Sequence, residues 1–147
     1  MNRSNNLLTI TFLTIALFFP NAAQAMTIQQ FDKMAMSDQV EYIADLIDGA
    51  QKVLTNDGKP GVAAQVKFLF TTRNPGATGT IGMRAFETSL TSLRAIDEKN
   101  VEKNPTAHRL EVEQAMASAL KNHGIILPKS FLTVANNFKP KYPPQSN

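Results

Sequence analysis

The residues of this chain whose side chains could do metal or thiol chemistry are few. The 147-residue sequence has no cysteine, which excludes thiol catalysis and cysteine-ligated metals. Its two histidines, His108 and His123, fall on one expected helix, about 22 Å apart at 1.5 Å per residue, too far to share a metal there. His108 and Glu111 are one turn apart but would supply only two ligands, whereas catalytic zinc takes three from protein. We therefore expect no metal site.

A glycine-rich stretch, residues 74–82, is the next candidate. Gly76, Gly79 and Gly82 could let backbone amides wrap an anion ahead of a helix N-terminus. A dinucleotide fingerprint, however, needs glycines one residue apart after a strand, and a P-loop needs Gly-Lys-Ser/Thr. Neither pattern is present, so the stretch is interpreted as a connector. The sequence also lacks GxSxG and HExxH motifs. We expect no cofactor and no enzyme; a hydrolase or lyase with a site near His108 is the third-ranked alternative.

A stripe of acidic residues is the feature that most suggests binding. Its members recur every three or four residues between positions 37 and 58, which places them on one face of a helix. Such a stripe can be a plain solvated face, or a docking surface that steers a basic partner. Tyr42 lies beside it and could act as an aromatic anchor. The expected partner-binding residues are Asp38, Glu41, Tyr42, Asp45 and Asp48, and the lysine-bearing C-terminal region is the alternative contact surface.

The same stretch predicts the long helix around which the fold is organised. Its apolar residues repeat with the 3.6-residue period of a helix that has one buried face. Ser37 is the expected N-cap, and Gly58 suits the left-handed position that ends a helix. The residues expected on the buried face are Ile43, Leu46, Ile47, Ala50, Val53 and Leu54.

Similar patterns predict four or five further helices. Thr27 and Gln30 form a capping box for residues 28–34, and Pro60 opens residues 60–72. Thr78 or Thr80 caps residues 81–98, on which Arg94 and Glu98 are spaced for an ion pair. Asn104-Pro105 opens a helix that Gly124 closes, with Val112, Ala115, Met116, Ala119 and Leu120 on its buried face, and residues 129–137 form the last. The prediction is an all-α single domain, an irregular bundle of five or six helices.

The predicted helical bundle is also compatible with a second function. An apolar pocket between helices would suit a small ligand, and a carrier of small molecules is therefore the alternative function. The residues expected to line such a pocket are Met83, Phe86, Met116 and Phe131.

The N-terminal residues resemble a cleaved export signal. Arg3, the apolar run of residues 7–19 and the small-x-small pattern Ala23-Gln24-Ala25 predict cleavage after Ala25. The apolar run is shorter than the roughly 20 residues of a membrane helix. Residues 1–25 are thus an expected signal peptide, residues 26–138 a helical domain, and residues 139–147 a flexible Pro/Lys-rich tail. The expected location is periplasmic or secreted, with no membrane attachment after cleavage.

The charge of the chain argues against nucleic acid. The net charge of +3 falls to about +2 when Arg3 is removed, and no dense basic face interleaved with aromatic residues is present. We therefore expect no nucleic-acid partner.

One segment resembles a known family. Residues 101–124, VEKNPTAHRLEVEQAMASALKNHG, place Asn104-Pro105 before an alanine-rich helix that ends in Ala-Leu-Lys. This segment is similar to the C-terminal half of the Rap/Tai-type immunity proteins, and residues 42–54 are similar to their first long helix. These small exported helical proteins neutralise type VI secretion toxins in the periplasm. The resemblance implies a protein partner, and it assigns no individual site residue.

Overall fold

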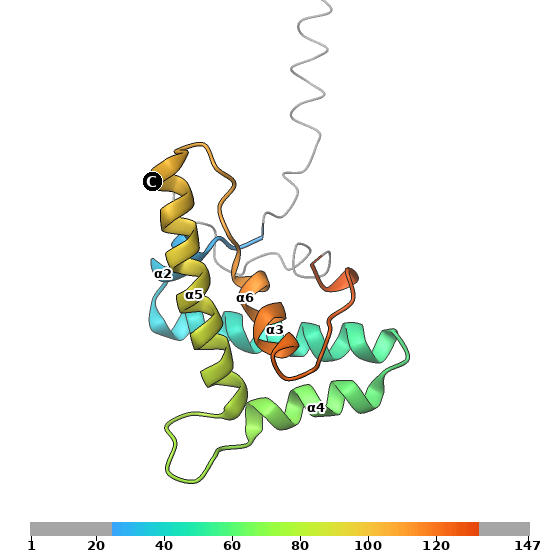
Figure 1. Cartoon of the computed structure of the whole chain (residues 1–147). Helices are drawn as coiled ribbons and strands as arrows, with labels where there is room; N and C mark the ends of the chain where they lie inside the picture. The colour runs from blue at the N-terminus through green and yellow to red at the C-terminus, as the bar shows by residue number, and fades with distance from the viewer. Residues whose placement is uncertain (1–24, 133–147) are drawn as a thin grey trace, which may run out of the picture.

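The computed structural model describes residues 25–132 and shows a single all-α domain. Within that range the chain forms α2 (Ile28–Asp32), α3 (Met36–Asn56), α4 (Pro60–Thr71), α5 (Ile81–Lys103) and α6 (Val112–Lys121), as Figure 1 shows. A further helical turn starts at residue 130, and its predicted continuation to residue 137 lies outside the described residues. The predicted signal peptide up to residue 24 and the predicted tail also lie outside them.

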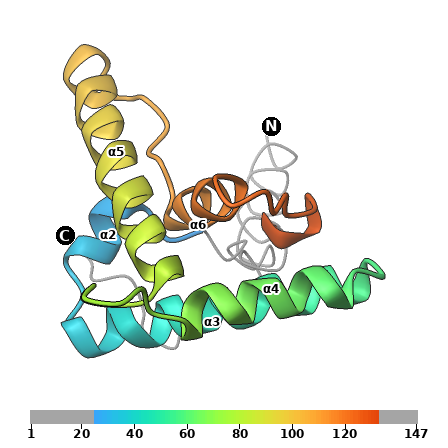
Figure 2. The ribbon, with the colours of Figure 1, turned by 60° about the horizontal axis from the view of Figure 1, so that its bottom comes forward.

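The helices pack as two pairs, α3 with α4 and α5 with α6, and the contact of α4 with α5 joins the pairs. Figures 1 and 2 show α3 and α4 lying side by side as an antiparallel hairpin, with α5 rising steeply away from it. Helix α4 packs on α5, and α5 packs on α6, which lies in the angle between α5 and the hairpin. Helix–helix packing of this irregular kind matches the predicted fold class.

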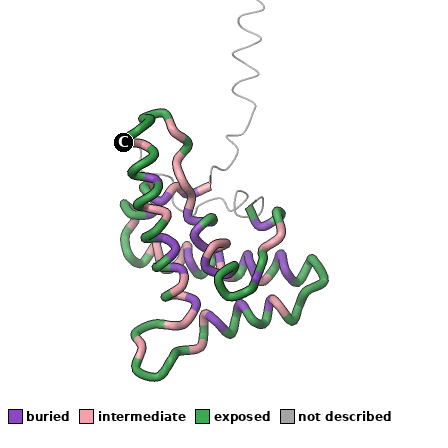
Figure 3. The backbone as a smooth tube through the Cα atoms, viewed as in Figure 1, coloured by how far each residue is buried: buried purple, intermediate pink, exposed green. Residues whose placement is uncertain are grey.

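The core follows the predicted helix faces closely. In α3 the buried side chains include Ile43, Leu46, Val53 and Leu54, and Ile47 is partly buried against them. All five residues predicted on the buried face of the last full helix are buried in α6. Figure 3 shows that the buried positions recur along each helix on the side that faces its neighbours. The largest fully buried side chains are Phe86, Phe131, Ile28, Leu46, Leu54, Met116, Leu120, Ile125, Glu113, Val66 and Val112.

Several helix ends also agree with the sequence. Thr27 and Gln30 form the predicted capping box, with both hydrogen bonds at 3.1 Å, and the Thr80 hydroxyl accepts from the Met83 amide at 3.2 Å. Gly58 and Gly124 have φ angles of 74° and 77°, the left-handed conformation that lets a helix end without strain.

The predicted start of α3 is wrong. The helix begins at Met36 with Ala35 as the cap residue, and Ser37 lies inside its first turn. The Gln39 side chain explains the difference: its amide donates to the Phe31 carbonyl at 2.9 Å and so ties the first turn of α3 to the end of α2. Tertiary contact thus sets the start of this helix, and no side chain caps it.

The predicted start of the fifth helix is also wrong. Asn104 ends α5, which runs to Lys103, and α6 begins only at Val112 with Glu111 as its cap. The side-chain Oδ1 of Asn104 accepts from the Thr106 amide at 3.1 Å, which is an Asx turn, and the residue before a proline disfavours helix. His108 therefore lies in a loop, and the helical spacing between the two histidines does not apply.

The glycine-rich connector is a loop, as predicted, but its last glycine has a packing role. Gly76 and Gly79 have positive φ angles, whereas Gly82 lies within α5, where an added Cβ would sit 2.8 Å from ring carbons of Phe70 on α4. The absence of a side chain at Gly82 thus allows α4 and α5 to meet closely.

We expect Gly82→Ala to lower the free energy of unfolding by about 1–3 kcal/mol, because the Phe70 ring must move out of its packing position. Gly61→Ala is the matched control: it lies in α4 with open space around it, so the loss of unfolded-state entropy should stabilise the protein by about 0.4–1 kcal/mol. Urea unfolding of both variants measures the difference. If both variants changed the free energy of unfolding equally and with the same sign, the close contact at Gly82 would be contradicted.

Candidate functional site

The predicted acidic stripe lies along the first half of α3. Asp45 and Asp48 are exposed, and Asp38 and Glu41 are half-buried. Among residues 25–132, neither Asp45 nor Asp48 forms an ion pair. Their carboxylates are therefore available to a positively charged group from outside the domain.

Two large apolar side chains are also exposed in the first half of α3. Met36 is 79% exposed and Val40, one helical turn later, is 61% exposed. Ala44 continues the same line and is also exposed. We name the combined face the α3 surface. Its members are Met36, Asp38, Val40, Glu41, Ala44, Asp45 and Asp48.

The apolar members of the α3 surface were missed in the sequence. Met36 and Val40 have the i, i+4 spacing that places two side chains on one helix face, and this spacing is visible without a structure. It was missed because the expected helix start, Ser37, left Met36 outside the helix.

Tyr42 differs from its predicted role as a surface anchor. Its side chain turns into the domain, where its ring lies 6.1 Å from that of Phe31, centroid to centroid. Its hydroxyl donates a hydrogen bond to the carboxyl group of Glu113 on α6. Burial, followed by the nearby Glu113 charge, raises the pKa of Tyr42 far above its ordinary value, so the phenol is neutral. Tyr42 therefore joins α3 to α6 and is not part of the α3 surface.

Glu113 is the most unusual residue in the described chain. It is completely buried, with its Oε1 accepting from Tyr42, and its Oε2 has no hydrogen-bond partner among residues 25–132. Burial raises the pKa of Glu113 above its ordinary range, although hydrogen bonds from Tyr42 and from the backbone lower it in part. The sequence analysis did not single it out, but Glu113 lies three and seven residues before the buried Met116 and Leu120. That spacing places it on the apolar face of the helix.

A second buried carboxylate holds the loop between α5 and α6. Asp97 accepts from the Leu110 amide at 2.8 Å and pairs with the Arg109 guanidinium, Nη2 to Oδ2, at 2.9 Å. The Asp97 side chain is almost completely buried and Arg109 is mostly covered. All the partners of Asp97 belong to the protein itself, so this cluster is structural.

The predicted apolar pocket is occupied by the protein's own core. Phe86, Met116 and Phe131 are fully buried, and Met83 packs against the same cluster. These side chains belong to one hydrophobic core or pack against it, and they line no hollow that the structure describes.

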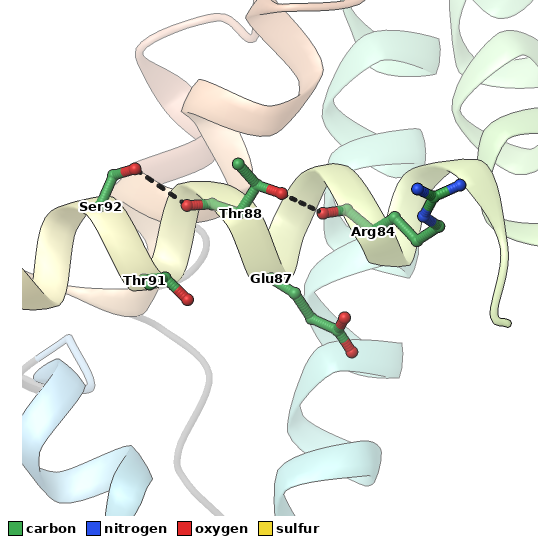
Figure 4. Close-up of a pocket in the computed structure, with 5 residues that line it drawn as sticks. All are labelled: Arg84, Glu87, Thr88, Thr91 and Ser92. Carbon is green, nitrogen blue, oxygen red and sulfur yellow. Dashed lines mark hydrogen bonds between the residues drawn. The ribbon is translucent and has the colours of Figure 1, made fainter. Parts of the chain in front are cut away.

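A described hollow of about 370 Å³ lies instead on the outer face of α5, lined by Arg84, Glu87, Thr88, Thr91 and Ser92. Figure 4 shows that all five side chains come from this one helix. The Thr88 and Ser92 hydroxyls donate to the carbonyls of the residues one turn earlier, at 2.9 and 3.0 Å. The hollow is open, and the hydroxyls of Thr88 and Ser92 are already bonded within the helix.

The histidines lie apart from both carboxylate clusters. His108 is exposed, with its Nε2 3.6 Å from Glu111, and His123 is exposed in the turn that follows α6. Within the described part of the chain, no group of three histidine, aspartate or glutamate side chains could hold a metal ion.

Comparisons with protein-family models, with curated proteins and with solved structures give no match to this chain. Among residues 25–132, no helix is both long enough and apolar enough to cross a membrane.

Proposed function

We propose that this protein is exported, has no catalytic activity, and binds a protein partner through the α3 surface. The observation that carries the proposal is the exposure of Met36 and Val40 on the helix that also carries Asp45 and Asp48, neither of which forms an ion pair among residues 25–132. Apolar side chains surrounded by charged ones are the usual composition of a specific protein interface, with burial at its centre and a polar rim. Periplasmic or secreted location is supported by residues 1–25, which have the pattern of a cleaved signal.

The chemistry of the α3 surface defines the partner it fits. Asp45 and Asp48 favour a partner that presents lysine or arginine at the rim, and Met36 and Val40 favour an apolar depression at its centre. A toxin neutralised in the periplasm, as implied by the resemblance of residues 101–124 to Rap/Tai-type immunity proteins, is one partner of this kind. The carrier alternative has less support, because its four expected pocket residues are packed into the core or against it.

In a pull-down with the tagged protein, we expect the double variant Asp45→Lys/Asp48→Lys to recover at least tenfold less partner than the original protein. The reason is that its reversed charges would face a basic rim on the partner. The matched control is Glu98→Lys/Glu102→Lys, which makes the same charge change at exposed positions on α5. The tagged protein would be recovered from the periplasm of its own host, and each retained protein quantified by mass spectrometry. If both double variants lost the partner equally, or if both retained it, the α3 surface would not be the binding surface.

A second comparison separates apolar contact from charge steering. Met36→Ser/Val40→Ser should weaken retention of the same partner at both low and high salt, whereas the aspartate variant should differ from the original protein mainly at low salt. Because Met36 and Val40 are exposed, their replacement should change the free energy of unfolding by no more than about 0.5 kcal/mol.

A further inference from the structure

The buried carboxyl group of Glu113 is incompletely satisfied. Its Oε2 is buried without a hydrogen-bond partner, and among residues 25–132 no basic side chain forms an ion pair with it. An unpaired buried polar atom destabilises a fold, and a buried charge does so more strongly. A glutamate at this position therefore needs a partner.

Besides its own backbone amide, whose hydrogen bond favours the charged form, three other groups affect this carboxyl group. The Tyr42 hydroxyl reaches it from α3, the carboxylate of Glu111 lies near it on its own segment, and the backbone of Met26 approaches it from the first described residues. The Met26 backbone favours the charged form of Glu113, as expected of an N–H donor that points toward a carboxylate.

Met26 is held firmly beside the first turn of α6. Its side chain is buried, and its carbonyl accepts from the Val112 amide at 2.9 Å. Two residues later, the Ile28 amide donates to the Leu110 carbonyl at 3.0 Å, and Thr27 and Glu111 form an isolated antiparallel bridge. The backbone nitrogen of Met26 is therefore fixed next to the segment that carries Glu113.

The predicted cleavage point is the bond that contains this nitrogen. The small-x-small pattern ends at Ala25, so Met26 would be the first residue of the exported chain. Hydrolysis by a signal peptidase adds water across the Ala25–Met26 bond: a carboxylate remains on Ala25, and the Met26 nitrogen becomes an α-amino group that is mostly protonated at pH 7. One amide N–H is thereby replaced by three N–H donors and a positive charge.

We propose that cleavage after Ala25 places the new α-ammonium group of Met26 against the Glu113 carboxylate, and that this buried ion pair completes the mature fold. This inference rests on the proposed export of the chain. The ammonium group can donate to the oxygen that lacks a partner, and a hydrogen bond between charged groups is stronger than one between neutral groups. Before cleavage, Glu113 has only neutral donors around it and is best accommodated as the uncharged acid.

The sign of the pH dependence follows from the pair. An α-amino group has an ordinary pKa of about 7.7–8.0, and a neighbouring carboxylate raises that pKa in the folded state. The stabilisation is therefore fully present below about pH 7.7 and is lost as the pH rises through the raised folded pKa. Tyr42, whose pKa is raised far above this window, stays neutral in it and does not titrate with the amine.

The test measures how fast the α-amine of the mature protein reacts with an amine-specific acylating reagent at pH 7. The full chain is expressed with its leader and recovered after export, and its intact mass gives the first residue. We expect a chain that begins at Met26, with an α-amine that reacts at least tenfold more slowly than in the Glu113→Gln variant. A rise of one pKa unit lowers the reactive neutral fraction of the amine tenfold.

A second comparison changes no side chain within the domain. A version that begins at Ala25, released from a tag that leaves no added residue, displaces the ammonium group by about 3.8 Å. Its α-amine should react as fast as that of the Glu113→Gln variant, and its thermal stability should lack the loss above pH 8 that the Met26 version shows. This comparison decides the question if Glu113→Gln fails to fold.

Equal reaction rates for the Met26 and Ala25 versions would overturn the ion pair, and an exported chain that begins at another residue would overturn the maturation step. Neither outcome depends on partner retention by the α3 surface. The lysine variants of α3 can therefore fail while the amine of Met26 remains protected, and the two proposals are separable.

Discussion

Replacing Phe86 with alanine is expected to lower the free energy of unfolding by about 3–5 kcal/mol, the usual cost of removing a phenylalanine side chain from a packed core. Phe86 is only 1% exposed and lies on α5, the helix that packs against both α4 and α6. The loss includes the transfer free energy of the ring and the cost of the cavity left behind. Guanidinium unfolding monitored by circular dichroism measures it.

Phe68 provides the control for this substitution. It belongs to α4 but is 59% exposed, so Phe68→Ala removes the same ring with little loss of burial. We expect a change of no more than about 0.5 kcal/mol. If the two alanine variants lost similar stability, the assignment of Phe86 to the core and of Phe68 to the surface would be wrong.

Replacing Asp97 with alanine should cost about 3–5 kcal/mol, because it leaves the largely covered Arg109 guanidinium without its partner and the Leu110 amide without its acceptor. The loop between α5 and α6 should loosen as a result. Hydrogen exchange at the Leu110 amide, measured together with the unfolding free energy, should become faster in this variant.

The ion pair of Asp57 and Lys59 is the control for Asp97. These groups are 3.0 Å apart, but both are about half exposed, so water screens them. Asp57→Ala should therefore cost no more than about 1 kcal/mol. An equally small effect at Asp97 would mean that the loop is held by its backbone alone.

Local patterns were enough to predict most helices and their buried faces. The periodicity of α3 and α6 depends on residues three and four apart, and the capping box of Thr27 and Gln30 and the terminal glycines depend on neighbours in sequence. Each of these signals can be read from a short window, and the structure agrees with each.

The errors arose where a distant residue decides the local structure. Asn104-Pro105 can end one helix or open another, and the contact of Asp97 with Leu110 favours the first. Arg94 is expected to pair with Glu98 on its own helix, but its guanidinium makes two hydrogen bonds of 2.7 Å to Asp32, the last residue of α2. Bidentate pairing of this kind is geometrically better than an i, i+4 contact, and sequence spacing does not reveal it.

In the candidate site, too, the features set by local sequence were predictable and those set by distant residues were not. Exposure of Asp45 and Asp48 follows from their position opposite the apolar face of α3 and was predictable. The inward turn of Tyr42 was not, because it requires Glu113, which comes from a helix far along the chain. The expected pocket failed for a related reason: an apolar pattern identifies side chains that will be buried together, but it does not distinguish a filled core from a cavity.

The pairing of residues 26–28 with residues 110–112 has a consequence for how the protein is made. The earliest part of the domain to leave a ribosome or a translocation channel gains its backbone partners only when the start of α6 follows. Until then the backbone of residues 26–28 lacks these partners, and a shortened product that stops before α6 would expose apolar surface that is buried in the whole domain, which favours proteolysis and aggregation. Synthesis must therefore be nearly complete before this molecule gains its full stability.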